Sequence, residues 1–173
     1  MRIEQTNQAA LNISDLGAQQ ARANMDLPKI ILVPTDFSSY AQEALDYALK
    51  LAKKLDARVY IMHAYLMPVA GWEGAWAFPG DMISQLETES RAKLDTTVKK
   101  ACETLPGTSA TFYSGDPRDG VIKAAKDLKA DLIIMGTHGR RGLSRAIMGS
   151  VTETVIRHAG CPVLAVHHPK DVV

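Results

Sequence analysis

The chain has 173 residues, a formal net charge of +1 and 46% apolar residues. This size and composition are typical of one globular domain with its own core, and the near-neutral charge argues against a general nucleic-acid-binding surface. No apolar run is long enough to span a bilayer, and the N-terminus lacks a secretory signal, so we expect a cytoplasmic protein. Cys102 and Cys161 have no metal-binding spacing and are expected to be buried free thiols.

Residues 1–28 are rich in Gln, Asn and Ala and carry only scattered apolar side chains. This composition predicts a flexible N-terminal extension, either a mobile tail or one marginal helix, ahead of a domain over residues 29–168. A docking role for the extension is an alternative that its composition does not favour.

The first predicted strand covers residues 29–33 and is closed by Pro34. Thr35 and Asp36 follow, at the carboxyl end of the strand, where open α/β sheets bind ligands. Asp36 is therefore either a ligand-binding carboxylate or a residue that only caps the next helix. That helix is predicted to start near Ser38 or Ser39, because an i, i+3, i+4 apolar stripe runs over residues 41–55.

A second strand is predicted over residues 58–65, with His63 and Ala64 near its carboxyl end. We expect His63 to be a packed, hydrogen-bonded residue. Residues 66–80 then hold both tryptophans and Phe78 among glycines and prolines. Such an aromatic loop either folds back on the domain or serves as a lid or partner contact, and both interpretations stay open.

A helix is predicted over residues 81–105, stopped by Pro106 and Gly107, and a short strand over residues 108–114. Asp116 and Pro117 then have the residue types of a helix N-cap and a first helical position. The helix that they begin carries its apolar face at Val121, Ile122, Ala125 and Leu128.

Residues 131–155 combine a strand, a glycine-rich basic loop and a helix start. The apolar run 132–135 predicts a buried strand that ends at Gly136, and Ser150 with Glu153 forms a capping-box signature. A helix that begins at a glycine presents unpaired backbone N–H groups and a positive dipole end, which suit a phosphate. The intervening loop carries Gly139, Gly142 and Gly149 together with Arg140, Arg141 and Arg145.

The last helix is predicted to end at Gly160, and residues 161–166 form a fifth strand that is apolar enough to need cover. His167 and His168 follow it, but adjacent residues on a strand point to opposite faces, so we expect two surface residues rather than a metal site.

The spacing of Gly136, Gly139, Gly149 and Ser150 matches G-x2-G-x9-G-[ST], which resembles the nucleotide-binding signature of the universal stress protein family. The resemblance covers about residues 29–167. The alternation of strands and helices itself predicts a single doubly wound α/β domain with a five-stranded parallel sheet and helices on both faces. The strand order 3-2-1-4-5 is implied by the resemblance alone.

The resemblance also implies an ATP site, with adenine near Thr35, Ala64 and Met135 and ribose near Asp36 and Gly136. The phosphates would lie over Gly139 and residues 149–152, with Arg140 or Arg145 adding charge and His138 shaping the loop. Mg²⁺ or Mn²⁺ would bind through the phosphates, and no protein metal ligand is expected. The implied nucleotide-binding residues are Pro34, Thr35, Asp36, Ala64, Met135, Gly136, His138, Gly139, Arg140, Gly149, Ser150, Val151 and Thr152.

Two functions of different class fit this site. One is a nucleotide-dependent regulatory module in the stress response that acts on an unknown protein partner, and the family resemblance implies that it is a homodimer through residues 162–166. The other is a slow ATP hydrolase or phosphotransfer enzyme that uses the same pocket. The sequence has neither a P-loop lysine motif nor a recognisable catalytic base, which favours the regulatory module. The residues do not distinguish ATP from AMP or a cyclic nucleotide.

Overall fold

The computed structural model of the chain describes residues 27–65, 80–139 and 148–167. Five parallel strands form one sheet in the order β3-β2-β1-β4-β5, as expected from the family resemblance. The strands are β1 (Ile30–Pro34), β2 (Arg58–Tyr65), β3 (Ser109–Ser114), β4 (Leu132–Gly136) and β5 (Val163–Val166). The described helices are α2 (Ser39–Leu55), α3 (Gly80–Thr104), α4 (Pro117–Leu128) and α5 (Ser150–His158).

Several sequence-based expectations lie outside the described residues. They concern the N-terminal extension, almost all of the aromatic loop, His168 and the loop arginines Arg140, Arg141 and Arg145.

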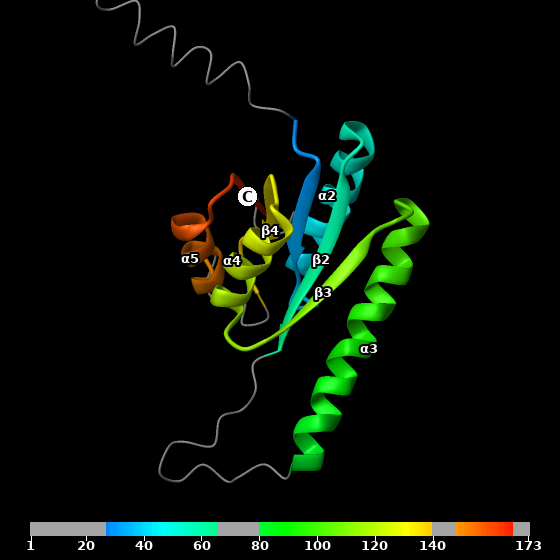
Figure 1. Ribbon diagram of the computed structural model, residues 1–173, viewed down its shortest axis with the longest axis vertical. Helices are drawn as coiled ribbons and strands as arrows, with labels where there is room; N and C mark the ends of the chain where they lie inside the picture. Colours follow the sequence, from blue (N-terminus) through cyan, green and yellow to red (C-terminus); the bar gives the residue numbers. More distant parts are fainter. Residues whose placement is uncertain (1–26, 66–79, 140–147, 168–173) are drawn as a thin grey trace, which may run out of the picture.

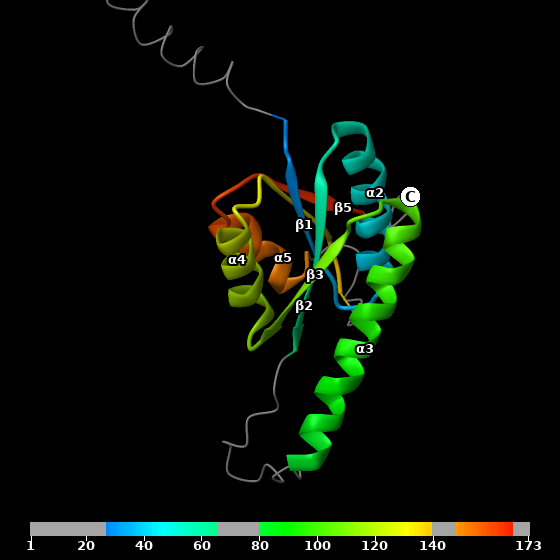
Figure 2. The same ribbon diagram turned by 45° about the vertical axis from the view of Figure 1, so that its right-hand side comes forward.

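Helices α2 and α3 cover one face of the sheet, and α4 and α5 cover the other (Figures 1 and 2). The two faces have separate cores because successive strand residues alternate between them. Ile31 and Val33 pack against α2, whereas Leu32 between them packs toward α4 and α5. The doubly wound fold is thus confirmed. Helix α3 extends past the carboxyl ends of the strands, which is visible in both views.

Helix α2 starts at Ser39, as predicted, and Ser38 caps it by accepting the Ala41 N–H at 3.2 Å. Asp116 caps α4 with Pro117 at the first helical position, which the sequence also predicted. The predicted capping box of α5 is wrong, because Gly149 is the N-cap and no side chain makes a capping bond. Ser150 is already the first residue of the helix.

The cysteines also differ from expectation. Cys102 and Cys161 are free, as predicted, but each is half-buried rather than buried. Helix α5 ends at His158, two residues earlier than expected, and Cys161 lies in the connection to β5. Partial burial, with the negative charge of Asp131 as a smaller cause, raises the pKa of the Cys161 thiol. This thiol is therefore poorly suited to act as a nucleophile.

Candidate functional site

The turn after β1 is built from short polar side chains that bind the backbone just ahead of them. Thr35 Oγ1 accepts the Phe37 N–H at 3.0 Å, and Asp36 Oδ1 accepts the Ser38 N–H at 3.0 Å. The Thr35 N–H donates to the Met62 carbonyl at 2.8 Å and so continues the β1–β2 ladder. The Asp36 side chain is consequently held at the carboxyl edge of the sheet, at the start of α2.

The chain after β4 is anchored to the start of α5. The Gly149 N–H donates to the Thr137 carbonyl at 2.9 Å, and Thr152 Oγ1 donates to the Gly136 carbonyl at 2.9 Å. Both threonines are buried, at 1% and 3% exposure. These two bonds bring the two ends of the glycine-rich loop together, so that residues 137–139 and the N-terminus of α5 lie next to one another.

Asp36 and Gly139 meet across the gap between β1 and β4. A Cβ atom added to Gly139 would lie 2.8 Å from Asp36 Oδ2, closer than a real side chain tolerates. The first neighbour of β1 on this side is β4, which is the point where the strand order reverses. The structure therefore places the aspartate turn and the glycine loop, which are far apart in the sequence, at one edge.

The remaining residues expected to bind the nucleotide differ in how deeply they are buried. Pro34, the last residue of β1, and Ala64 are half-buried near the strand ends, and so are Gly149 and Val151. Met135 is only 4% exposed and packs into the core on the α4 and α5 face, which leaves little of its side chain for a ligand. Ser150 is exposed at the start of α5.

His138 lies at the start of the glycine-rich loop, where it contacts Thr137 and Tyr40. Its Nδ1 lies 3.0 Å from Thr137 Oγ1, and its ring centroid lies 5.2 Å from that of Tyr40 in the first turn of α2. His63 is packed as predicted, with 4% exposure and Nδ1 at 2.7 Å from the Thr35 carbonyl oxygen.

Three structural contributors to the site were not predicted: Phe37, Tyr40 and Thr137. Tyr40 meets the site at Gly136. A Cβ on Gly136 would lie 2.8 Å from the Tyr40 carbonyl oxygen, so the first turn of α2 packs directly against the end of β4. Phe37 has a φ angle of 64°, a left-handed conformation that is unusual for an aromatic residue. Tyr40 and Phe37 take part through tertiary contacts, and sequence periodicity does not predict such contacts.

Asp116 is a second carboxylate that follows a strand, but it is engaged by its own helix. Hydrogen bonds from the Arg118 side chain and backbone N–H lower the pKa of Asp116 to about 2. The same pairing raises the pKa of the Arg118 guanidinium. Asp116 therefore has a structural role in capping α4.

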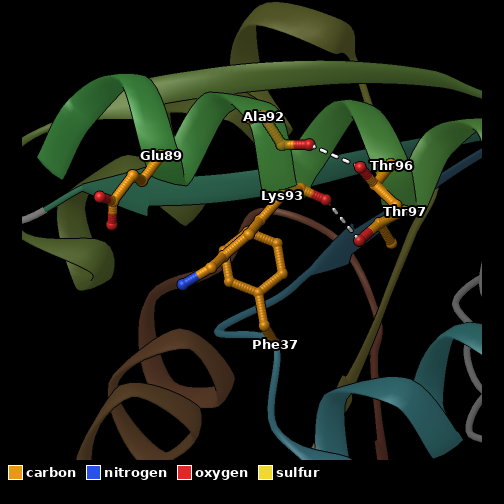
Figure 3. Close-up of a pocket in the computed structure, with 6 residues that line it drawn as sticks. All are labelled: Phe37, Glu89, Ala92, Lys93, Thr96 and Thr97. Carbon is orange, nitrogen blue, oxygen red and sulfur yellow. Dashed lines mark hydrogen bonds between the residues drawn. The ribbon is translucent and has the colours of Figure 1, made fainter. Parts of the chain in front are cut away.

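A shallow groove of about 520 Å³ lies between Phe37 and α3 (Figure 3). Two threonine hydroxyls in it donate to backbone carbonyls one helical turn earlier, at 2.8 and 2.9 Å. None of the described residues expected to bind the nucleotide lines the groove, although Phe37 directly follows Asp36. Its lining residues are Phe37, Glu89, Ala92, Lys93, Thr96 and Thr97.

Across residues 27–65, 80–139 and 148–167, no group of three or more His, Cys, Asp or Glu side chains could hold a metal ion. No helix in the described part of the chain is long and apolar enough to cross a membrane.

Comparisons with known proteins agree with this architecture. The model of the universal stress protein family matches residues 28–167. A universal stress protein of Methanocaldococcus jannaschii is 39% identical over 153 residues, which cover 86% of this chain and 88% of the relative.

Two solved structures show the same fold. A universal stress protein in complex with cAMP has a TM-score of 0.62 at 24% identity and covers 81% of this chain and 97% of its own. A family protein of Arabidopsis thaliana with AMP bound has a TM-score of 0.55 at 22% identity, with 84% and 95% covered.

Proposed function

This chain belongs to the universal stress protein family, and from that premise we propose that it binds ATP and acts as a nucleotide-dependent regulatory module in the stress response. The nucleotide site lies at the carboxyl edge of β1 and β4. In this proposal the domain occupies residues 29–168 after an N-terminal extension, and the protein is cytoplasmic.

The observation that carries the proposal is the approach of Asp36 to Gly139. Because Gly139 has no Cβ, its backbone can lie close to Asp36 Oδ2, whereas a Cβ at position 139 would lie 2.8 Å from that oxygen. A carboxylate oxygen is a suitable acceptor for ribose hydroxyls, as in other doubly wound nucleotide-binding folds. We assign the ribose to Asp36 and Gly136, and Gly139 to the phosphates.

The phosphates are assigned to the start of α5. Its first backbone N–H groups belong to Ser150, Val151 and Thr152, and the positive end of the helix dipole favours an anion there. Ser150 is exposed at this end of the helix. The Thr152 hydroxyl already donates its hydrogen to the Gly136 carbonyl, so Thr152 contributes its N–H only. Arg140 would add charge.

The base is assigned to the ends of β1 and β2, near Thr35 and Ala64. Met135 would contribute an edge of its largely buried side chain. Solved family members carry cAMP and AMP, which share the adenosine of ATP. A divalent cation, Mg²⁺ or Mn²⁺, would be held by phosphate oxygens and water, because the described residues offer no cluster of acidic side chains.

The test uses calorimetry to follow the titration of ATP, AMP and cAMP into three proteins. These are the wild type, Gly139→Ala and a matched control, Gly160→Ala. The methyl group of Gly139→Ala would displace the Asp36 carboxylate, a flexible side chain, so we expect the ATP affinity to fall about tenfold or more with little change in Tm. A Cβ at Gly160 meets nothing within 4 Å, so that variant should bind like wild type.

Wild-type protein that binds none of the three nucleotides would refute the proposal, and so would a Gly139→Ala variant with unchanged affinity. Phosphate release is measured in the same samples, because rapid turnover would favour the enzyme over the regulatory module.

A further inference from the structure

We propose that His63 is a positioning residue of the nucleotide site: its buried imidazole holds the turn after β1 so that the Asp36 carboxylate faces Gly139. This inference rests on the proposed function and adds a residue to it.

The position of the imidazole proton follows from its partner. His63 Nδ1 lies 2.7 Å from the carbonyl oxygen of Thr35, and a carbonyl can only accept a hydrogen bond. Nδ1 therefore carries the proton and donates it. Since Thr35 Oγ1 and the Thr35 N–H are already bonded to Phe37 and Met62, the His63 bond completes the fixation of this residue.

The rings around His63 fix the same turn from a second direction. The His63 ring lies 4.3 Å from the Phe37 ring and 5.9 Å from the Phe112 ring, centroid to centroid. Arg91 of α3 places its guanidinium 3.8 Å from the centroid of the Phe112 ring. A row of side chains thus connects α3, through β3 and β2, to the turn.

Phe37 has an unfavourable backbone conformation that this row of side chains has to hold. Its φ of 64° costs free energy for a residue with a Cβ, and such a conformation persists only where surrounding contacts impose it. The contact with the tilted His63 ring holds the Phe37 side chain against the α2 and α3 core. With Thr35 and Phe37 both held, the residue between them, Asp36, has its Oδ1 on the Ser38 N–H and its Oδ2 toward Gly139.

Two substitutions separate the hydrogen bond from the packing. In His63→Asn the amide nitrogen stands the same number of bonds from the backbone as Nδ1, so the donor to Thr35 is kept while the ring is lost. In His63→Phe an aromatic ring is kept and the donor is lost, leaving the half-buried Thr35 carbonyl without this partner.

The experiment measures ATP affinity, Tm and the hydrogen exchange of the Phe37 and Ser38 amides in wild type and both variants. We expect His63→Phe to lose about tenfold in ATP affinity and to exchange these two amides faster. His63→Asn should restore most of the affinity and the protection, whatever its Tm. Affinity that instead follows Tm, or a His63→Phe variant that binds and protects like wild type, would overturn the inference.

A double-mutant cycle tests whether His63 acts through Asp36. The effects of His63→Phe and Asp36→Asn on ATP affinity should be strongly non-additive, whereas His63→Phe and Ser150→Ala should add. Additive effects in the first pair would contradict the proposed role. If wild type binds no ATP, the proposed function fails on its own, and amide exchange alone decides whether His63 holds the turn.

Discussion

Asp116 shows how one residue can link sequence, local structure and pH dependence. It caps α4 by accepting the Arg118 N–H at 2.8 Å, and its carboxylate also pairs with the Arg118 side chain. These bonds lower its pKa from 3.8 to about 2. A carboxyl with a depressed pKa in the folded state stabilises the protein at pH values above its unfolded pKa. That contribution is lost as the pH falls from about 4 to about 2.

We therefore expect Asp116→Asn to reduce the pH dependence of unfolding between pH 4 and pH 2 while keeping the cap, since Asn is also a good N-cap residue. Asp116→Ala should lose the cap as well and cost about 1 kcal/mol at pH 7. Urea unfolding at a series of pH values checks both. An unchanged slope in Asp116→Asn would show that the pairing with Arg118 contributes little in solution.

Some local features of single residues could be predicted from the sequence, and others could not. Asp116 and Pro117 were predicted because a cap depends on two or three neighbouring residues. The capping box at Ser150 failed because the glycine before it takes the N-cap position and leaves Ser150 inside the helix. The left-handed conformation of Phe37 has no sequence signal, and its ring contacts that of His63 on another strand.

At the scale of elements, the contact between α2 and β4 joins the two halves of the site. Gly136 ends β4 where the Tyr40 backbone of α2 crosses it, and a Cβ there would lie 2.8 Å from the Tyr40 carbonyl oxygen and 2.9 Å from its carbonyl carbon. Gly136, which the family resemblance assigns to the nucleotide site, is thus also required for packing α2 against β4.

Gly136→Ala should consequently destabilise the fold, because backbone cannot move aside as a side-chain tip can. We expect a loss of about 1–3 kcal/mol in the free energy of unfolding, the range for overpacked cores. Chemical denaturation of Gly136→Ala beside Gly160→Ala, whose Cβ meets nothing within 4 Å, measures the difference. Equal stability of the two variants would mean that α2 shifts freely over β4.

The elements themselves were largely predicted from periodicity, but their arrangement was not. Alternating strands and helices are sufficient for a doubly wound sheet, whereas the order β3-β2-β1-β4-β5 came only from the family resemblance. The neighbouring positions of β1 and β4 are what bring Asp36 and Gly139 together, so the site depended on the same resemblance. Side-chain directions, such as the inward Thr152 hydroxyl, required the packed structure.

At the scale of the whole molecule, β5 is an edge of the sheet. All four of its residues are half-buried, so its apolar side chains are incompletely covered within one chain. Pro162 and Val166 accept hydrogen bonds from β4 at 3.0 and 3.1 Å. Because backbone groups alternate along a strand, those of Val163 and Ala165 point to the open edge, where a second copy of the strand can pair.

We propose that the protein is a homodimer through residues 162–166 and expect Ala165→Pro to abolish it. Proline removes the N–H that points outward and leaves the bonds to β4 in place, a position where edge strands tolerate it. Light scattering over a range of concentrations should give a dimer for wild type and for Ala165→Ser, which keeps the N–H. The proline variant should be a monomer with an unchanged circular dichroism spectrum. A wild-type monomer, or a dimer that survives the proline, would place any assembly on another surface.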